Sequence, residues 1–235
     1  TGTRTIHAEL RLKDPNVARL LSYDRYPRFS LIDHFLSPDI GLGQFAACDY
    51  EELGDFADRP YECAVEALGQ KMSISLRRQA GLRLQGRALP FMVRKVLLLE
   101  AGQEVLEVQY RVKNASHLPA SGVFGIEWNI NLLGGGHNDQ AYYEVPGKKL
   151  DDAHLDSTGG LPQVSTIIMG NRHLGIRLEL SLQPAAEVWR FPVETVSNSE
   201  DGIEGLYQAS CLLIRVPFNL EPQRETGVTL TWSQR

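Results

Sequence analysis

The sequence lacks the features that mark several common functional classes. Lys and Arg number 24 against 29 Asp and Glu, the formal net charge is −5, and no basic run exceeds two residues. Nucleic-acid-binding domains and domains that bind anionic membranes usually carry a basic patch, so both classes are disfavoured. No apolar stretch approaches the ~20 residues that a membrane-spanning helix needs. We therefore expect neither a nucleic-acid partner nor a membrane.

Cysteine is also scarce, and no secretion signal is visible. The three cysteines are Cys48, Cys63 and Cys211. Their number is odd, they lie far apart in the sequence, and their spacing matches no zinc pattern. Such cysteines are typical of free thiols in a reducing compartment, which predicts a cytoplasmic protein. The chain begins with Thr1 and not with Met, which we interpret as a domain excised from a longer protein.

Familiar catalytic signatures are missing. The sequence contains no GxSxG, HExxH, CxxC or dinucleotide-binding fingerprint. The glycine-rich stretch GGGHNDQAYYEV at 134–145 is followed by no GK[ST] and opens no helix, so it is not a phosphate-binding loop. We accordingly predict no cofactor.

What the sequence has in abundance is strand patterning. Alternating or β-rich segments occur at 4–12, 28–35, 61–68, 71–79, 91–100, 104–114, 122–133, 164–170, 174–180, 187–191, 206–216 and 227–232. Gly69-Gln70 and Ala101–Gln103 join neighbouring segments as hairpin turns. Helical periodicity is limited to one or two turns within 16–23, and long loops are expected at 36–60 and 134–162.

These segments predict a single all-β domain over residues 1–235, with a short N-terminal lead-in at 1–22. Many antiparallel strands in a chain of this length need two large packed sheets. A closed barrel would leave a lumen that the few inward polar residues do not line. We predict a large antiparallel two-sheet β-sandwich in which one sheet is curved and has a concave face.

The strand at 122–133 offers the strongest candidate site. In FGIEWNINLL, apolar side chains from Phe124 to Leu132 alternate with Glu127, Asn129 and Asn131. A carboxylate accepts hydroxyl hydrogen bonds and an amide both donates and accepts, which suits vicinal sugar hydroxyls. A plain solvated strand face is the competing interpretation. Asn is uncommon in strands, so two at alternate positions favour a site.

Further candidates lie on the expected rim of this face. His137, Tyr142 and Arg190 carry groups that hydrogen-bond or stack on a sugar, although each has an ordinary structural interpretation. Asp151, Asp152 and Asp156 crowd one loop but lack the DxDxDG pattern of a calcium site, so we expect a solvated loop and no metal.

Asp33-His34 offers a carboxylate and an imidazole at the end of a predicted strand. One interpretation has Asp33 orient His34 for general base catalysis. The favoured one makes Asp33 an acceptor of backbone hydrogen bonds and His34 a satisfied interior residue.

Three segments carry a resemblance to a known family. They are YPRFSLIDHFL, FGIEWNINLL and TVSNSEDGIEGLYQASCLLIRVPFNLEP, which resemble the C-terminal β-sandwich region of 4-α-glucanotransferases and α-amylases of glycoside hydrolase family 57. The similarity extends from about Tyr23 to Trp232. In that family the region is similar in fold to galactose mutarotase, a supersandwich of two antiparallel sheets.

The resemblance implies an α-glucan context with the chemistry elsewhere, because a separate N-terminal barrel supplies the catalytic carboxylates in that family. It implies a non-catalytic accessory domain whose partners are an α-glucan or malto-oligosaccharide and the catalytic domain of the same polypeptide. Two alternatives stay open. One is a mutarotase-like epimerase that uses Glu127 with His137 or His34, and the other is a purely structural domain that packs on the catalytic barrel.

Overall fold

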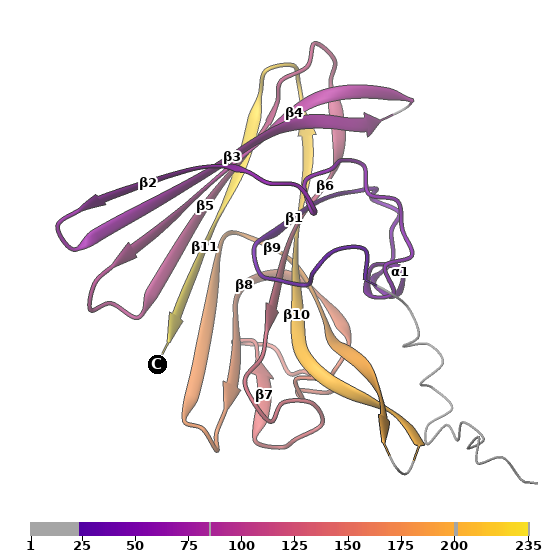
Figure 1. Ribbon diagram of the computed structural model, residues 1–235, viewed down its shortest axis with the longest axis vertical. Helices are drawn as coiled ribbons and strands as arrows, with labels where there is room; N and C mark the ends of the chain where they lie inside the picture. The colour runs from indigo at the N-terminus through magenta and orange to yellow at the C-terminus, as the bar shows by residue number, and fades with distance from the viewer. Residues whose placement is uncertain (1–23, 85, 200–201, 235) are drawn as a thin grey trace, which may run out of the picture.

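A computed structural model describes the backbone of residues 24–84, 86–199 and 202–234. The described residues form eleven strands and one short helix (Figure 1). Their bounds are β1 Ile32–Leu36, α1 Leu42–Ala46, β2 Glu62–Leu68, β3 Lys71–Leu84, β4 Arg87–Glu100, β5 Val105–Asn114, β6 Ala120–Ile130, β7 Ala141–Glu144, β8 Gly159–Asn171, β9 Ile176–Ser199, β10 Gly202–Leu220 and β11 Glu225–Gln234. No helix among these residues is long and apolar enough to span a membrane.

All strands pair antiparallel in one continuous sheet. The order along it is β1-β6-β10-β9-β11-β5-β4-β3-β2, with β8 paired to β9 and β7 paired to β8. The prediction of an all-β antiparallel fold is confirmed. The expected layers are parts of one bent sheet, because the 24-residue β9 pairs with β11 through residues 178–183 and with β10 through residues 187–199.

Most of the predicted strands are present in the structure, but many of them are longer than predicted. Both predicted hairpin turns are present, between β2 and β3 and between β4 and β5. The segments predicted at 174–180 and 187–191 are one strand, β9. Within the two predicted loops lie α1 and β7, which the sequence patterns did not indicate. The strand predicted at 4–12 and the helical turns at 16–23 lie outside the described residues.

The main core lies between the inner faces of the bent sheet. Phe124, Ile126 and Trp128 of β6 point into it, as the alternation predicted, and they are 1%, 0% and 7% exposed. Side chains from β4, β5, β8, β10 and β11 pack against them. Burial of this apolar area is the dominant favourable term in folding.

A second, smaller core covers the outer face of β6. Phe45 of α1 and Tyr50 pack there with Val123 of β6, Phe191 of β9 and Leu213 of β10. The 24–52 segment, apart from the edge strand β1 within it, therefore lies over the outer face of the sheet (Figure 1). The polar side of β6 is not open to solvent along most of its length.

The two hairpins β2–β3 and β4–β5 project beyond the rest of the sheet (Figure 1). We call residues 62–76 and 97–107 the arm. Every residue of β2 is exposed, and burial increases along β5 only from Val108 onwards. The arm carries apolar side chains that nothing in the described chain covers, including Val65 at 59% and Leu68 at 86% exposure.

Candidate functional site

Glu127, the centre of the predicted polar row, lies on the outer face of β6 beneath the 24–52 segment. β1 pairs antiparallel with β6 so that His34 lies opposite Gly125, one diagonal step from Glu127. Gly125 leaves room for the imidazole, because a Cβ there would meet the His34 Cβ at 3.2 Å. The register therefore brings His34 and Glu127 together on the same face, where both are 0% exposed.

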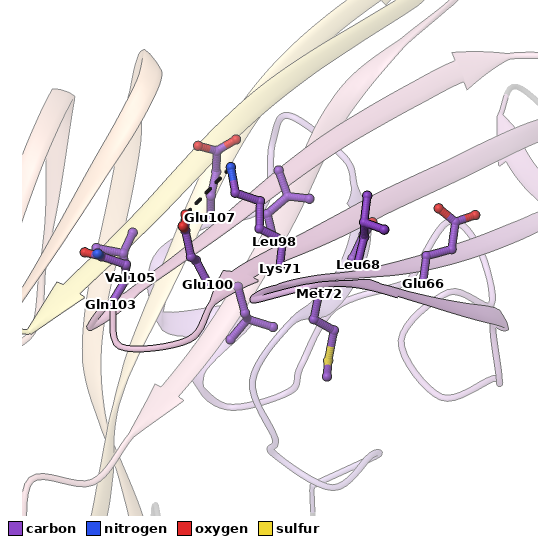
Figure 2. Close-up of a pocket in the computed structure, with 11 residues that line it drawn as sticks. Glu66, Leu68, Lys71, Met72, Leu98, Glu100, Gln103, Val105 and Glu107 are labelled. Atoms are coloured by element: carbon purple, nitrogen blue, oxygen red, sulfur yellow. Dashed lines mark ion pairs between the residues drawn. The ribbon is translucent and has the colours of Figure 1, made fainter.

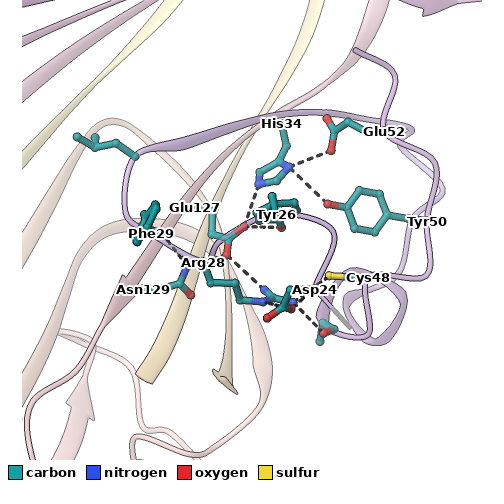
Figure 3. A network of polar contacts seen from close by, with 12 residues as sticks. Asp24, Tyr26, Arg28, Phe29, His34, Cys48, Tyr50, Glu52, Glu127 and Asn129 are labelled. Carbon is teal, nitrogen blue, oxygen red and sulfur yellow. Dashed lines mark hydrogen bonds and ion pairs between the residues drawn. The ribbon is translucent and has the colours of Figure 1, made fainter. Parts of the chain in front are cut away.

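Both carboxylate oxygens of Glu127 already have partners within the protein (Figure 3). His34 donates from Nε2 to Oε2 at 2.9 Å, and the Tyr26 hydroxyl donates to the same oxygen at 2.7 Å. Arg28 approaches Oε1 at 3.3 Å, and the Asn129 amide donates to Oε1 at 2.7 Å. A buried carboxylate needs such bonds to remain charged.

The second nitrogen of His34 is also occupied. His34 Nδ1 lies 2.9 Å from Glu52 Oε2 and 3.4 Å from the Tyr50 hydroxyl. Glu52 in turn accepts the backbone N–H of Phe35 at 2.6 Å, which fixes it beside β1. The imidazole is therefore held between two carboxylates.

The pKa values of this pair follow from that arrangement. Burial acts to lower the pKa of His34, but the charge of Glu52 and the bonds to Glu127 and Glu52 outweigh it and raise the pKa from 6.5 to about 9. Burial acts to raise the pKa of Glu127, yet the bond and charge of His34, with Arg28 and Asn129, lower it from 4.5 to about 2. The pair is an ion pair near neutral pH.

Two arginines close the network from the outside. Arg28 bonds the carbonyl of Ala46 at 3.2 Å and the Cys48 sulfur at 3.1 Å, and its Nε donates to Asp24 at 2.7 Å. Arg25 donates to the carbonyls of Cys48 and Tyr50. These contacts hold the loop that follows α1 down over Glu127. We call Tyr26, Arg28, His34, Glu52, Glu127 and Asn129 the buried polar network.

The structure divides the six predicted site residues into separate places. Glu127 and the half-buried Asn129 share the buried polar network, where the Asn129 amide also bonds the Phe29 carbonyl at 2.8 Å. Asn131 lies one residue beyond the end of β6 and is exposed. The expected open row along the strand is thus interrupted by the 24–52 segment.

The other three candidates surround the loop between β6 and β8. Arg190 on β9 is 5% exposed, and its guanidinium donates to the Ser157 hydroxyl and to the Asp152 carbonyl, the latter at 3.0 Å. Tyr142 on β7 is half-buried, with the Arg172 guanidinium 4.2 Å from its ring centre. His137 is exposed, with 71% of its side chain accessible. Arg190 therefore supports the loop from within and does not reach solvent as a rim residue.

Around His137 the loop gathers a second polar group. The rings of His137 and His154 lie with centres 4.0 Å apart and planes tilted by 32°. His154 contacts Asp152 through Nδ1 at 2.7 Å and Asp139 through Nε2 at 3.0 Å, and His137 Nδ1 lies 3.4 Å from Asp156. We call these five residues the loop cluster. The sequence pairs His137 with Asp139 as a possible cation or sugar contact or a turn, and it places Asp152 and Asp156 in a separate acidic loop; His154, which joins the two groups, was not predicted.

Asp33 has a role different from either interpretation of its sequence. It lies on the opposite face of β1 from His34, because neighbouring strand residues alternate. Its Oδ2 accepts a bond from the Tyr61 hydroxyl at 2.5 Å and from Lys95 Nζ at 2.9 Å. Asp33 does not orient the imidazole; Glu52 and Glu127 do. The expectation that His34 is a satisfied interior residue agrees with these contacts.

Comparison with known proteins gives the family of this chain. The sequence profile of the family described as "Alpha-amylase/4-alpha-glucanotransferase, C-terminal" matches residues 1–230. The chain belongs to this family. The relationship predicted from the three sequence segments is confirmed.

Individual relatives agree with this assignment. An α-amylase of Dictyoglomus thermophilum is 29% identical over 213 residues, which cover 89% of this chain and 29% of the relative. A 4-α-glucanotransferase of Thermococcus litoralis is 27% identical over 94% of this chain and 29% of its own length. The chain thus spans about three tenths of the relatives that it matches, and its family is named for their C-terminal part.

Solved structures confirm the fold. The 4-α-glucanotransferase of Thermococcus litoralis matches with a TM-score of 0.72 at 23% identity, covering 97% of this chain and 30% of that one. A galactose mutarotase-like protein of Clostridium acetobutylicum matches with a TM-score of 0.58 at 9% identity, covering 88% and 80%. The predicted mutarotase-like supersandwich is therefore correct. At such identities the likeness shows the fold and transfers no activity.

Proposed function

We propose that this chain is a non-catalytic accessory domain of an α-glucan-acting enzyme of the α-amylase or 4-α-glucanotransferase type. In this proposal the domain packs against the catalytic domain of the same polypeptide through its arm and offers a weak malto-oligosaccharide contact on its exposed loops. Family membership carries the first part of the proposal. The geometry of the buried polar network and of the arm carries the rest.

The buried polar network argues for a structural role and against the epimerase alternative. Mutarotation needs a base at the anomeric hydroxyl and an acid at the ring oxygen, each within hydrogen-bond reach of the sugar. Glu127 and His34 are both 0% exposed, and each of their polar atoms already has a partner. A sugar would have to displace Tyr26, Arg28 and the loop after α1.

The arm supplies the surface for the catalytic domain. A groove of about 540 Å³ lies on it, lined by Glu66, Leu68, Lys71, Met72, Ser73, Leu98, Leu99, Glu100, Gln103, Val105 and Glu107. Figure 2 shows Leu68, Leu98 and Glu107 on one side of the sheet, with Lys71 Nζ paired to Glu100 at 3.8 Å. Apolar side chains flanked by charged ones are the usual anatomy of a protein interface.

The occupant that we assign to this groove is the catalytic part of the polypeptide. The relatives reported above extend well beyond the matched region, which is 29% of their length. Exposed apolar side chains gathered on one surface of a folded domain mark interaction sites, and Leu68 is 86% and Val105 40% exposed on either side of the Lys71–Glu100 pair. An inter-domain contact would cover these side chains and the edge of β2, where the described residues supply no further strand.

For glucan, the proposal rests on the candidates that remain at the surface. Asn131 and His137 are exposed, whereas Glu127 and Arg190 are buried in internal contacts. The Tyr142 ring already contacts the Arg172 guanidinium and lies against Gly170. A shallow surface with few aromatic anchors binds weakly, and a Kd near 1 mM corresponds to only about 4 kcal/mol. We also propose a cytoplasmic location, because all three cysteines are unpaired.

A sugar titration tests the glucan contact. Heteronuclear NMR spectra of this chain are recorded with maltose through maltoheptaose, and with glucose and galactose as comparison sugars. We expect saturable shifts with the malto-oligosaccharides at millimolar concentrations, reduced in Asn131→Ala and in His137→Ala and unchanged in the exposed control His117→Ala. If no sugar gives saturable shifts, the proposed glucan contact is wrong. The proposal that the arm docks on the catalytic domain is tested separately.

Lysine substitutions test the arm. Leu68→Lys and Val105→Lys place a charge in the groove, and Leu174→Lys, at a residue 41% exposed outside the arm, is the matched control. In this chain alone all three should change the free energy of unfolding by no more than about 0.5 kcal/mol. In the longer polypeptide the two arm variants should lower the unfolding temperature and the control should not. Equal behaviour of all three there would contradict the docking proposal.

A further inference from the structure

The loop cluster has the composition of a transition-metal site. Ligand atoms of His137, Asp152 and His154 all lie within 4.8 Å of one another. Imidazole and carboxylate are the ligands that zinc and its neighbours prefer, whereas calcium and magnesium take oxygen ligands alone. Three protein ligands with a fourth position open to solvent is the arrangement of an accessible zinc site.

The carboxylates around these histidines occupy the positions of outer-shell partners. A metal-bound histidine usually donates its other ring N–H to a carboxylate, which fixes the tautomer and the orientation of the ring. Asp156 lies 3.4 Å from Nδ1 of His137, and Asp139 lies 3.0 Å from Nε2 of His154. Nε2 of His137 and Nδ1 of His154, the latter beside Asp152, are then the nitrogens left for a metal ion.

The backbone that carries the cluster is fixed to the body of the domain. Leu155 is fully buried, and its carbonyl accepts the Ser210 hydroxyl at 2.7 Å. The Tyr143 N–H bonds the Ala153 carbonyl at 2.6 Å, and Arg190 bonds the Asp152 carbonyl from the core side. Asp152 and His154 are therefore presented by a rigid support, which is what a specific metal site requires.

Two adjustments are needed, and the loop allows both. Zinc bonds of 2.0–2.1 Å in tetrahedral geometry place neighbouring ligand atoms about 3.3 Å apart, closer than the 4.8 Å limit of this group. The side chain of His137 is 71% exposed and follows Gly134 and Gly136, whose φ angles are 70° and 84°. His137 can thus close on a metal, while the exposed Asp152 carboxylate turns so that its Oδ1, 2.7 Å from His154 Nδ1, opens to that spacing.

The local charge also favours a dication. Asp139, Asp152 and Asp156 surround two imidazoles, so with neutral histidines three carboxylates outnumber the two nearby guanidiniums, those of Arg172 and Arg190, which bond the carbonyls of Asp139 and Asp152. We propose that His137, Asp152 and His154 form a binding site for Zn²⁺ or a similar transition-metal ion, with Asp139 and Asp156 as outer-shell partners. This inference does not depend on the proposed glucan function, because the metal alone tests it.

Isothermal titration of this chain with ZnCl₂, after removal of metals with a chelator, tests the site. We expect one saturable equivalent, lost in His154→Ala and weakened at least tenfold in His137→Ala. Asp139→Asn, which alters only an outer-shell partner, should weaken binding by about 10- to 100-fold. His117→Ala and His173→Ala change exposed histidines outside the cluster and should bind like the unaltered chain.

Three results would overturn the proposal. They are no saturable zinc binding, binding that survives in the His137→Ala and His154→Ala double variant, and saturable binding of CaCl₂ in place of ZnCl₂. Thermal unfolding of every variant without metal verifies that it is folded before its titration is interpreted. Cobalt(II) added in place of zinc provides a readout independent of heat, because tetrahedral coordination by the two imidazoles gives an intense visible absorption that His154→Ala should abolish.

Discussion

Replacing Glu127 by alanine should destabilise the domain strongly, although the residue lies in a row that resembles a ligand site. The substitution removes the acceptor of four side chains, Tyr26, Arg28, His34 and Asn129. It leaves Arg28 with Asp24 and His34 with Glu52 as their remaining carboxylate partners, beside a cavity at a position with no solvent access. The cost therefore arises because each of these two cations loses one of its two carboxylate partners, and because hydrogen bonds are lost.

The magnitude follows from the burial of the pair. Removing one partner of a buried ion pair costs about 3–5 kcal/mol. For a domain of roughly 150–250 residues, 1 kcal/mol corresponds to about 2–4 °C in unfolding temperature. Glu127→Ala should therefore lower the unfolding temperature by about 6–20 °C, as followed by circular dichroism and checked by urea denaturation at 25 °C.

The matched control is Asn131→Ala, four residues along the same polar row but exposed. Its effect should stay within about 0.5 kcal/mol. A drop for Glu127→Ala no larger than that of the control would refute the structural role of the network. His34→Ala and the Glu127→Ala/His34→Ala double variant complete a double-mutant cycle. The double variant should lose clearly less unfolding free energy than the sum of the two single variants, because the side chains of Glu127 and His34 are in contact.

The same network predicts how the difference between the unaltered chain and Glu127→Ala depends on pH. The folded pKa of His34, about 9, lies above its usual 6.5, so its contribution is complete below pH 6.5 and is lost as the pH rises through 9. The folded pKa of Glu127, about 2, lies below its usual 4.5, so its contribution is complete above pH 4.5 and is lost as the pH falls through 2. The difference in stability, measured by urea denaturation across pH, should be largest between pH 4.5 and 6.5; a difference that increases towards pH 9 would contradict the assignment.

Three further substitutions test other parts of the structure. Asp33→Ala leaves Lys95, which is 4% exposed, without its carboxylate and should cost about 3–5 kcal/mol in urea denaturation; a loss below about 1 kcal/mol would show that the pair is not needed. Gly170→Ala should cost about 1–3 kcal/mol, because its Cβ would lie 2.5 Å from the Tyr142 ring. Gly43→Ala in α1 meets no atom within 4 Å and should stabilise by about 0.5–1 kcal/mol, so a loss of stability there would count against the helix.

The inner face of β6 was predictable because its signal is local. Phe124, Ile126 and Trp128 alternate with polar residues, and an antiparallel strand with one buried face has this pattern whatever covers the other side. The burial of Glu127 was not predictable in this way. It depends on a segment about 100 positions earlier in the chain, which supplies Tyr26 and Arg28. A polar face under a polar cover has the same sequence pattern as one that faces water.

The alternation of side chains along a strand bears on the partner of His34. Adjacent residues of a strand point to opposite faces, so Asp33 and His34 could not share a site if both lay in β1. The structure places Asp33 with Lys95 and His34 with Glu127 accordingly. Choosing Glu127 as the partner required the register between β1 and β6, and sequence alternation alone does not fix which strands pair.

The loop cluster was half visible in the sequence. His137 and Asp139 are close together in the sequence, and Asp152 and Asp156 lie in the acidic loop, but no fixed spacing links the two pairs. His154 joins them because β7 brings the two parts of the loop side by side, through the bridge between Tyr142 and His154. β7 has only four residues, too few for alternation to indicate a strand reliably.

Hydrogen exchange of the arm, compared between this chain and the longer polypeptide, tests the central claim most directly. Amides of residues 62–76 and 97–107 should exchange fast in this chain, where β2 is the edge of the described sheet, and markedly more slowly when the proposed catalytic domain is present. Amides of β6 should exchange slowly in both. Equal exchange of the arm in the two proteins would contradict the account of the chain as an accessory domain that docks through this surface.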